Sequence, residues 1–159
     1  MAYEVPALGT AGQVYTAAAH NIIVNDILEF APLVGVWSTY VPVLTQLGAV
    51  TKTVNYASYI VAGKLVIVSV YLDITGTGTG NNAVTVTLPV TAKAQAGITG
   101  VFYLLDANVD NYVGTVVGAS TTTVAFYRAN AGNTPVGVSP NFTFANGDSI
   151  RFSVTYEAA

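Results

Sequence analysis

The sequence contains no cysteine and very little charge. The absence of cysteine excludes a disulfide framework and a metal site built from thiolates. Charged residues make up only 8% of the 159 residues and hydrophobic residues 52%, whereas about 25% charged residues is usual for a soluble domain. We therefore expect a surface of Thr, Ser, Asn, Gly and Tyr side chains, together with apolar surface that is buried against other copies of the chain.

Basic residues are few, and no long apolar run is present. The formal net charge is −3, and the five basic residues are scattered: Lys52, Lys64, Lys93, Arg128 and Arg151. A surface that follows nucleic-acid phosphates needs clustered cations, so no nucleic-acid partner is expected. The longest apolar run, around residues 65–72, is far shorter than the roughly 20 residues of a membrane helix, and no membrane insertion is expected. The start Met-Ala-Tyr-Glu lacks the basic region of a secretory signal.

Residues 1–36 are expected to form an N-terminal arm, one α-helix and a linker. Thr16 can cap a helix that begins at Ala17, and Pro32 ends it. The apolar residues of this helix recur every three or four positions and form one narrow stripe: Ala19, Ile23, Ile27 and Phe30. Such a helix is marginal alone and needs a partner surface. We interpret the last three residues of the stripe as oligomer contacts in a coiled coil, or alternatively as the face of a docking peptide.

Residues 37–159 are expected to form a β domain. Short segments with strand-like alternation are separated by turns that contain Gly, Asn and Pro. The expected strands are 37–44, 51–60, 64–74, 83–88, 98–106, 112–117, 122–128 and 149–157, with a weaker one at 136–143. This pattern predicts a mainly β fold, an antiparallel β-sandwich of the jelly-roll type.

The segment 63–73 gives the strongest strand signal, because both of its faces are apolar. One face carries Val66, Val68, Val70 and Leu72, and the other carries Leu65, Ile67 and Tyr71. Such a strand is expected at the centre of a sheet. Because the chain has so little charge, one face can also be a seam between subunits. Ser69 interrupts the second face, and we predict that this second face is the oligomer interface.

No set of residues typical of a catalytic site is present. His20 is the single histidine, and it lies far in sequence from the carboxylates of the β domain. The aspartates of that domain fall at expected strand ends or turns, where solvated carboxylates are common: Asp73, Asp106, Asp110 and Asp148. We therefore expect no enzyme activity, no cofactor and no catalytic metal.

Two polar loops carry the candidate ligand-binding residues. In the stretch 76–82 glycine alternates with threonine, and no lysine or helix follows as a phosphate loop would need, so we interpret it as a flexible hairpin tip. Segment 106–111 has the oxygen spacing that begins a calcium loop but lacks the Gly and Glu of an EF-hand, which leaves a looser calcium site or an ordinary polar turn. Tyrosine rings beside this turn are candidate stacking surfaces for sugars. The predicted ligand-binding residues are Tyr103, Asp106, Asn108, Asp110, Tyr112, Thr77, Thr79 and Asn81.

Several short motifs follow one another in an order that resembles a known family. They are Trp37-Ser-Thr-Tyr40-Val-Pro42-Val-Leu44-Thr45, Val54-Asn-Tyr56-Ala57-Ser-Tyr59, Gly63-Lys64, Leu88-Pro89-Val90, Asn146-Gly147-Asp148 and Thr155-Tyr156-Glu157. With these motifs, residues 37–159 resemble the C-terminal β-sandwich domains of bacteriophage tail-fibre, minor tail and other virion-surface proteins. The segment Gly12-Gln13-Val14-Tyr15-Thr16 is similar to the leader that precedes such domains in phage structural proteins.

The resemblance implies a non-enzymatic structural protein that is made in the host cytoplasm and becomes part of the virion surface. It also implies a homotrimer whose residues 1–36 attach to other phage tail or capsid proteins. The chain is short and has no shaft repeats, which favours a compact knob over a long fibre. We expect a tail-associated knob that contacts the host surface and its glycans. The alternative is a capsid decoration or head-fibre protein that stabilises or dresses the shell without recognising a receptor.

Overall fold

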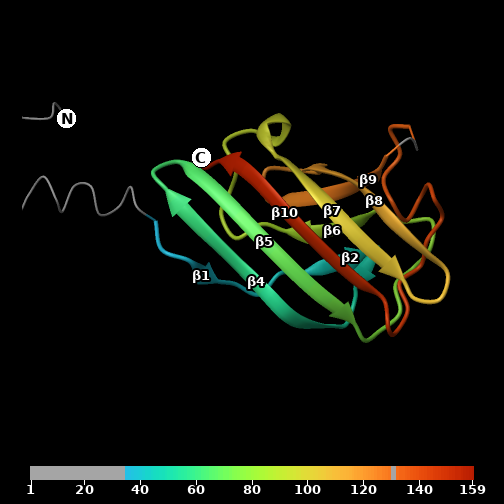
Figure 1. Ribbon diagram of the computed structural model, residues 1–159. Coiled ribbons are helices and arrows are strands. Elements are labelled where there is room, and N and C mark those ends of the chain that lie inside the picture. The colour runs from blue at the N-terminus through green and yellow to red at the C-terminus, as the bar shows by residue number, and fades with distance from the viewer. Residues whose placement is uncertain (1–34, 130–131) are drawn as a thin grey trace, which may run out of the picture.

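The structure is a computed structural model that describes residues 35–129 and 132–159. These residues are mainly β structure (Figure 1). The strands in chain order are β1 (Ser38–Thr39), β2 (Leu44–Gln46), β3 (Gly48–Ala49), β4 (Lys52–Ala62), β5 (Leu65–Ile74), β6 (Val84–Thr87), β7 (Thr99–Asp106), β8 (Asp110–Gly118), β9 (Thr123–Arg128) and β10 (Ser149–Glu157). A short 3₁₀ turn, η2 (Gln95–Gly97), lies between β6 and β7.

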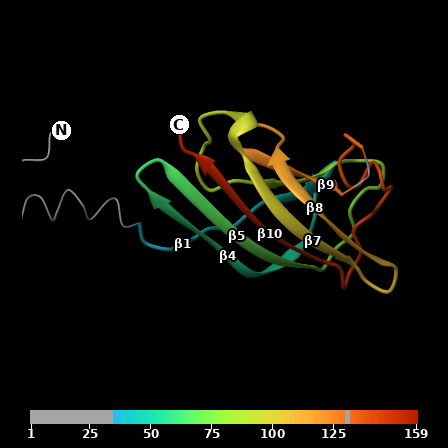
Figure 2. The same cartoon turned by 45° about the horizontal axis from the view of Figure 1, so that its top comes forward.

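All of these strands belong to one antiparallel sheet. Its order is β1-β4-β5-β10-β7-β8-β9-β6-β2-β3. Strands that follow one another pair as β4–β5, β7–β8 and β8–β9, whereas β10 comes from the end of the chain and inserts between β5 and β7. The sheet curls into a half-barrel (Figures 1 and 2), and Figure 1 shows β6 and β2 behind β5 and β10. The expected central position of the strand at 63–73 is confirmed, because β5 is paired on both sides.

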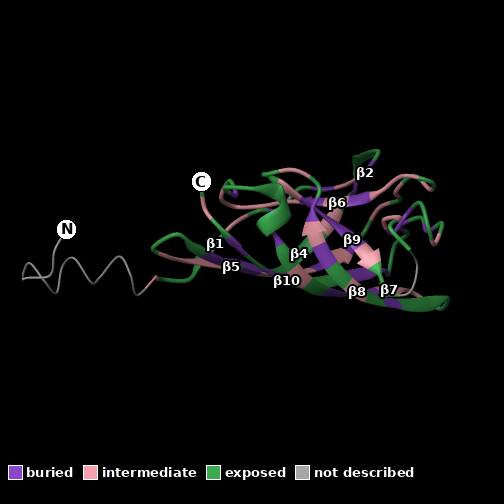
Figure 3. Ribbon diagram, turned by 90° about the horizontal axis from the view of Figure 1, so that it is seen from above, coloured by how far each residue is buried: buried purple, intermediate pink, exposed green. Residues whose placement is uncertain are grey.

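The hydrophobic core lies inside the curl and is built from alternate residues of the strands. β10 shows the pattern clearly, since its inward-facing side chains are at most 4% exposed: Ile150, Phe152, Val154 and Tyr156. Figure 3 shows the same alternation of buried and exposed positions along several strands. Rings from three strands meet edge to face, with the centroid of Phe126 lying 5.3 Å from those of Phe102 and Phe152. Burial of a side chain of this size contributes about 1.5–3 kcal/mol, so this core is the main source of stability.

β5 is apolar on both faces, but the described residues bury only one of them. The inward face of β5 is at most 2% exposed: Val66, Val68, Val70 and Leu72. On the opposite face, Leu65 is 47% exposed and Ile67 is 36% exposed. The two faces therefore have different surroundings, and the second face is open to solvent or to another molecule.

Two of the expected strands differ from the structure: one is interrupted and the other is absent. The segment 37–44 is a strand only at β1 and again from Leu44, because Pro42 has no N–H with which to join a strand ladder. The segment 136–143 consists of turns and irregular backbone. Gly137 there has a φ of +100°, and Pro140 lacks an N–H. Its apolar residues instead anchor a loop to the core, since Phe142 is 2% exposed.

The curled sheet has two different ends. At the first, called the entry end, Gly35 lies against the backbone of Val61, and the Ala158 N–H donates to the Lys64 carbonyl at 2.7 Å. At the opposite end, called the loop end, lie the β5–β6 connection, the β7–β8 turn and the turn before β10. The described chain therefore begins and finishes at the entry end, where the connection between β6 and β7 also lies beside the C-terminus.

The expected arm and helix lie outside the described residues, as do the predicted oligomer contacts Ile23, Ile27 and Phe30. These expectations therefore stay predictions. Within residues 35–129 and 132–159, no helix has the length and hydropathy that crossing a membrane requires.

Candidate binding surface

The outer face of the sheet, which points away from the core, carries side chains in rows that cross β4, β5, β10, β7 and β8. Strand register determines which residues lie side by side. The aromatic row contains Tyr56, Tyr71, Arg151, Tyr103 and Val113. The next row toward the entry end contains Ser58, Ser69, Ser153, Val101 and Thr115. The following row, called the aliphatic row, contains Ile60, Ile67, Thr155, Thr99 and Val117. The outer face therefore changes from aromatic and cationic to aliphatic along the strands.

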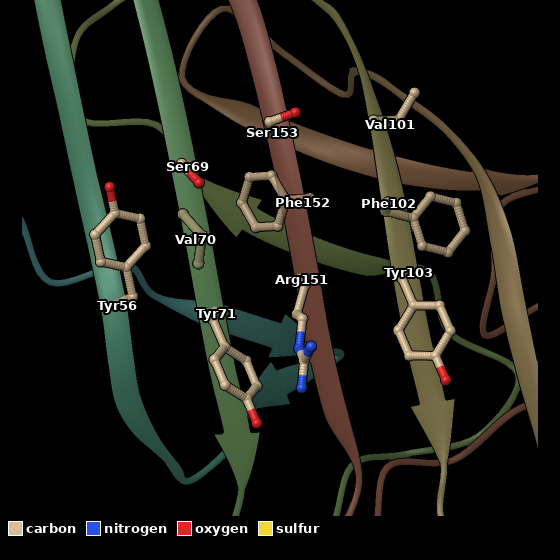
Figure 4. A pocket seen from close by; sticks show the side chains of 10 residues that line it. All are labelled: Tyr56, Ser69, Val70, Tyr71, Val101, Phe102, Tyr103, Arg151, Phe152 and Ser153. Atoms are coloured by element: carbon tan, nitrogen blue, oxygen red, sulfur yellow. The ribbon is translucent and has the colours of Figure 1, made fainter.

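A shallow groove of about 390 Å³ lies over the first two of these rows (Figure 4). Arg151 stands between Tyr71 and Tyr103, which are its direct neighbours on β5 and β7. The guanidinium carbon lies over the Tyr71 ring, 4.1 Å from the centroid, which is the geometry of a cation–π contact. This contact holds the charged group of Arg151 on the surface of the sheet.

The Arg151 guanidinium has no carboxylate partner among the described residues. The salt bridge formed within residues 35–129 and 132–159 joins Lys93 to Glu157 at 2.8 Å, near the entry end. The contact with Tyr71 is made to an aromatic ring, and the N–H donors of the guanidinium lie along the edges of this planar group. The groove thus presents a positive charge with available donors.

Two tyrosines flank this charge with exposed rings. Tyr56 is 46% exposed and Tyr103 is 38% exposed. The Tyr103 hydroxyl donates to Asn111 Oδ1 at 2.7 Å, which fixes the direction of the ring. Each side chain presents an apolar ring and a polar hydroxyl, a combination that suits ligands with both kinds of surface.

The predicted interface residues of β5 all lie on this outer face. Leu65 and Ile67 are exposed, and Tyr71 is half-buried beneath Arg151. On the neighbouring strand β7, Val101 is 63% exposed and adds to the apolar surface. The structure thus brings together an exposed apolar area on the outer face, and the role of this area as an oligomer interface stays a prediction.

The loop between β5 and β6 carries the candidate residues Thr77, Thr79 and Asn81, all of which are exposed. This loop does not form a hairpin tip, because β6 pairs with β2 and β9 rather than with β5. Its Gly78 N–H donates to the Phe144 carbonyl at 2.9 Å. The interpretation as a flexible hairpin tip is therefore wrong: the loop crosses between the two sides of the curl and is hydrogen-bonded to the segment before β10.

The β7–β8 turn carries the other candidate residues. Asn108 adopts the left-handed conformation with a φ of +65°, and Asp110 is exposed at the start of β8. Partial burial and the nearby Asp148 carboxylate raise the pKa of the Asp106 side chain above its ordinary value. Tyr112 is only 6% exposed and packs edge to face against a core phenylalanine, so its ring cannot stack on a ligand.

Asp148 ties the turns of the loop end together. It is 2% exposed, and its Oδ1 accepts from the Ala107 N–H at 2.8 Å while its Oδ2 accepts from the Ala145 N–H at 2.7 Å. Both oxygens are therefore engaged with backbone. Asp148 acts as a structural anchor between the β7–β8 turn and the turn before β10.

The described residues contain no group of three His, Asp or Glu side chains placed to hold a metal ion. Asp106 and Asp110 lie on either side of their turn, and Asp148 is occupied by backbone N–H groups. His20 lies outside the described residues. Both interpretations of the segment 106–111, a looser calcium site and an ordinary polar turn, therefore stay predictions.

Sequence reasoning missed the groove itself. Of its lining residues, Tyr103 is a predicted ligand contact and Tyr71 a predicted interface residue, whereas Arg151, Tyr56 and Ser153 are not among the predicted binding residues. A signal was present, because Arg151 alternates with buried residues of β10 and so had to point outward. The neighbours of Arg151 could not be predicted from the sequence, because the register of β10 between β5 and β7 joins segments that lie far apart in the chain.

Comparison with known proteins adds no further assignment: the chain matches no protein-family model, no curated protein and no solved structure. Its function is therefore argued from the geometry of the outer face and from the motifs of the sequence.

Proposed function

We propose that the chain is a structural component of a bacteriophage virion, a compact homotrimeric knob that is held to the tail through residues 1–36 and contacts the host surface. The observation that carries this proposal is the outer face, which exposes aliphatic and aromatic side chains over several strands. A chain with only 8% charged residues has little means of keeping such a face soluble alone. Other copies of the chain would cover part of it.

The two ends of the fold support a knob that is attached at one side. Gly35, the first described residue, and Ala159 both lie at the entry end. The β5–β6 connection, the β7–β8 turn and the turn before β10 occupy the opposite end. A particle that holds the chain by its N-terminal segment would therefore present the loop end outward.

The subunit contact is placed over the aliphatic row and Leu65, near the entry end. Leu65 and Ile67 supply exposed apolar surface there, whereas the aromatic row lies further toward the loop end. Covering the aliphatic row would remove apolar area from water at about 25 cal/mol per Å². Tyr71 lies at the margin of this contact, and the groove around Arg151 stays open.

The architecture is proposed to be a variant of the antiparallel sandwich, with jelly-roll-like crossing between layers. Figure 3 shows β4, β5, β10, β7 and β8 on one side of the core and β6 and β2 on the other. β9 links these sides by pairing with both β8 and β6. The layers of the proposed sandwich are thus parts of one continuous sheet.

A second candidate function is a capsid decoration or head-fibre protein. The hydrogen bonding of the loop end favours this function. Asp148 and Gln46 bind the backbone of the loops through hydrogen bonds, which restrict the loops from adapting their conformation to a receptor. Loops of fixed conformation suit a protein that covers the capsid surface without recognising a receptor.

Imaging of the assembled particle separates these functions. Antibody fragments raised against the purified chain are bound to phage particles, which are then examined by electron microscopy. Labels at the tail support the proposed function, and labels spread across the head support the decoration role. Particles that contain the chain nowhere would overturn both.

A further inference from the structure

The groove around Arg151 has a local charge opposite to that of the whole chain. Among its lining residues Arg151 is the sole ionised side chain, and the protein carries a formal net charge of −3. The nearest carboxylate along β5, that of Asp73, accepts a hydrogen bond from Asn55 Nδ2 at 2.5 Å. The groove is therefore a localised cationic site on a chain that is otherwise acidic.

The orientation of Arg151 favours a planar anion. Its guanidinium carbon lies 4.1 Å from the centroid of the Tyr71 ring, and this cation–π contact restricts the side chain before any ligand arrives. A carboxylate can approach the guanidinium edge and accept two parallel hydrogen bonds, a pairing that a lysine ammonium cannot reproduce. Because part of the side-chain entropy is already lost, less remains to be lost on binding.

The residues around Arg151 favour a ligand that also carries hydroxyls and a ring. Tyr103 and Tyr56 expose ring surface, and the hydroxyls of Ser69 and Ser153 line the groove (Figure 4). From Tyr56 to Tyr103 the aromatic row crosses four strands, which corresponds to roughly 14 Å. That length suits an extended oligomer better than a small free anion.

We infer that the groove binds an acidic saccharide, whose carboxylate pairs with the edge of Arg151 and whose sugar rings lie on Tyr103 and Tyr56. This inference rests on the proposed contact with host surface glycans and names their chemical class. It also assigns the contact to the side of the sheet rather than to the loops at its end. Ser69 and Ser153 would hydrogen-bond the sugar hydroxyls.

The experiment uses the full chain and an array of bacterial-surface oligosaccharides that contain a uronic acid. Each is printed beside its carboxyl-reduced neutral counterpart and beside a sulfated, anionic derivative of that counterpart. The wild-type protein is expected to bind acidic members at least about tenfold more tightly than their reduced counterparts. Arg151→Gln should abolish this preference, and Arg151→Lys should retain only part of it, because it keeps the charge but loses the paired donors.

Arg128→Gln is the matched control. Arg128 also lies over a tyrosine, 5.4 Å from the Tyr112 centroid, but outside the groove. Its loss should leave binding unchanged, and thermal melting checks that each variant is folded. Equal effects of Arg128→Gln and Arg151→Gln would contradict a specific role for the groove.

The other outcomes separate this inference from the proposed function. Binding of neutral members that is insensitive to Arg151→Gln would overturn the acidic-saccharide inference and leave host contact standing. Equal binding of sulfated analogues would show general anion binding and reject the carboxylate preference. Loss of the oligomer in Arg151→Gln would assign the groove to a second copy of the chain. Binding to no saccharide would count against both the inference and glycan contact.

Discussion

Tyr156 is the last inward-facing residue of β10 and joins the C-terminal strand to a distant segment. It is 3% exposed, and its hydroxyl donates to the Val90 carbonyl at 2.8 Å. Burial raises the pKa of Tyr156 to about 12. Burial likewise raises the pKa of Tyr40 above its ordinary value. These phenols are therefore harder to ionise in the folded chain than in the unfolded one.

This pKa predicts how Tyr156→Phe changes the response to alkali. Because the folded pKa lies above the ordinary value of 10.0, the contribution of Tyr156 is complete below about pH 10 and is lost as the pH rises toward 12. The free energy of unfolding, measured by urea titration over this range, should fall less steeply in Tyr156→Phe than in the wild type. At pH 7 the variant should be about 1 kcal/mol less stable, through the lost hydrogen bond. Identical slopes would contradict the assignment.

Asp106 gives a prediction of opposite sign. Partial burial and the Asp148 carboxylate raise its pKa, so the ionised form present at pH 7 opposes folding, and protonation as the pH falls relieves this effect. Asp106→Asn should therefore be more stable than the wild type at pH 7. The difference should shrink as the pH falls through the raised folded-state pKa of Asp106. Thermal melting at both pH values measures it, and a variant that is less stable at pH 7 would show that the carboxylate is needed by its turn.

The surroundings of some residues are predictable from the sequence, and those of others are not. Outward positions such as Arg151 follow from alternation in β10, but Tyr112 was placed beside a turn, and only the register of β8 shows that it faces the core. Gln46 was not singled out at all. Its amide is 1% exposed and joins Phe142 and Phe144, about 100 residues away, through hydrogen bonds at 2.6 and 3.1 Å. Such partners depend on tertiary contacts that no local pattern records.

At the level of elements, β7 and β10 approach closely at Gly100. Gly100 is paired with Val154, and a Cβ at this position would overlap the Ser153 carbonyl oxygen and lie 2.8 Å from the Val154 Cα. These are backbone atoms of a paired strand, so they cannot move aside without disturbing the ladder. The close approach therefore requires glycine.

Gly100→Ala should destabilise the fold by about 1–3 kcal/mol, because the added methyl group overpacks this strand pair. Gly97→Ala is the matched control, since a Cβ at Gly97 has nothing within 4 Å. That variant should stay within about 0.5 kcal/mol of the wild type. Chemical denaturation compares the two, and equal stability of both variants would argue against close packing at Gly100.

The elements were more predictable than their arrangement. Alternation gave the strands from Lys52 onward, with ends that differ from the structure by a few residues, and it separated the buried and open faces of β5. The order of the strands was not predictable, because β10 pairs with strands that lie about 50 and 80 residues before it. The interpretation of the stretch 76–82 as a hairpin tip is wrong for the same reason. Both the strand order and the path of this loop depend on pairing between distant segments, and such pairing produces no periodic pattern in the local sequence.

For the whole molecule, we propose that the open outer face is covered in an assembly of several chains. The chain has an ordered core of its own, yet it leaves Leu65, Ile67 and Val101 exposed on one face. The groove and the aliphatic row lie on that same face at different positions along the strands. One surface could thus serve both assembly and recognition.

The most direct test is the mass of the full chain in solution, measured by size-exclusion chromatography with light scattering at micromolar concentration. We expect three times the 16.4 kDa chain mass for the wild type. Ile67→Asp should give a smaller species, because burying the new carboxylate in the subunit contact would remove its hydration without a compensating partner. Val109→Asp, at an exposed position of the β7–β8 turn, should keep the wild-type mass. A stable wild-type monomer, or an Ile67→Asp variant that remains a trimer, would contradict the account.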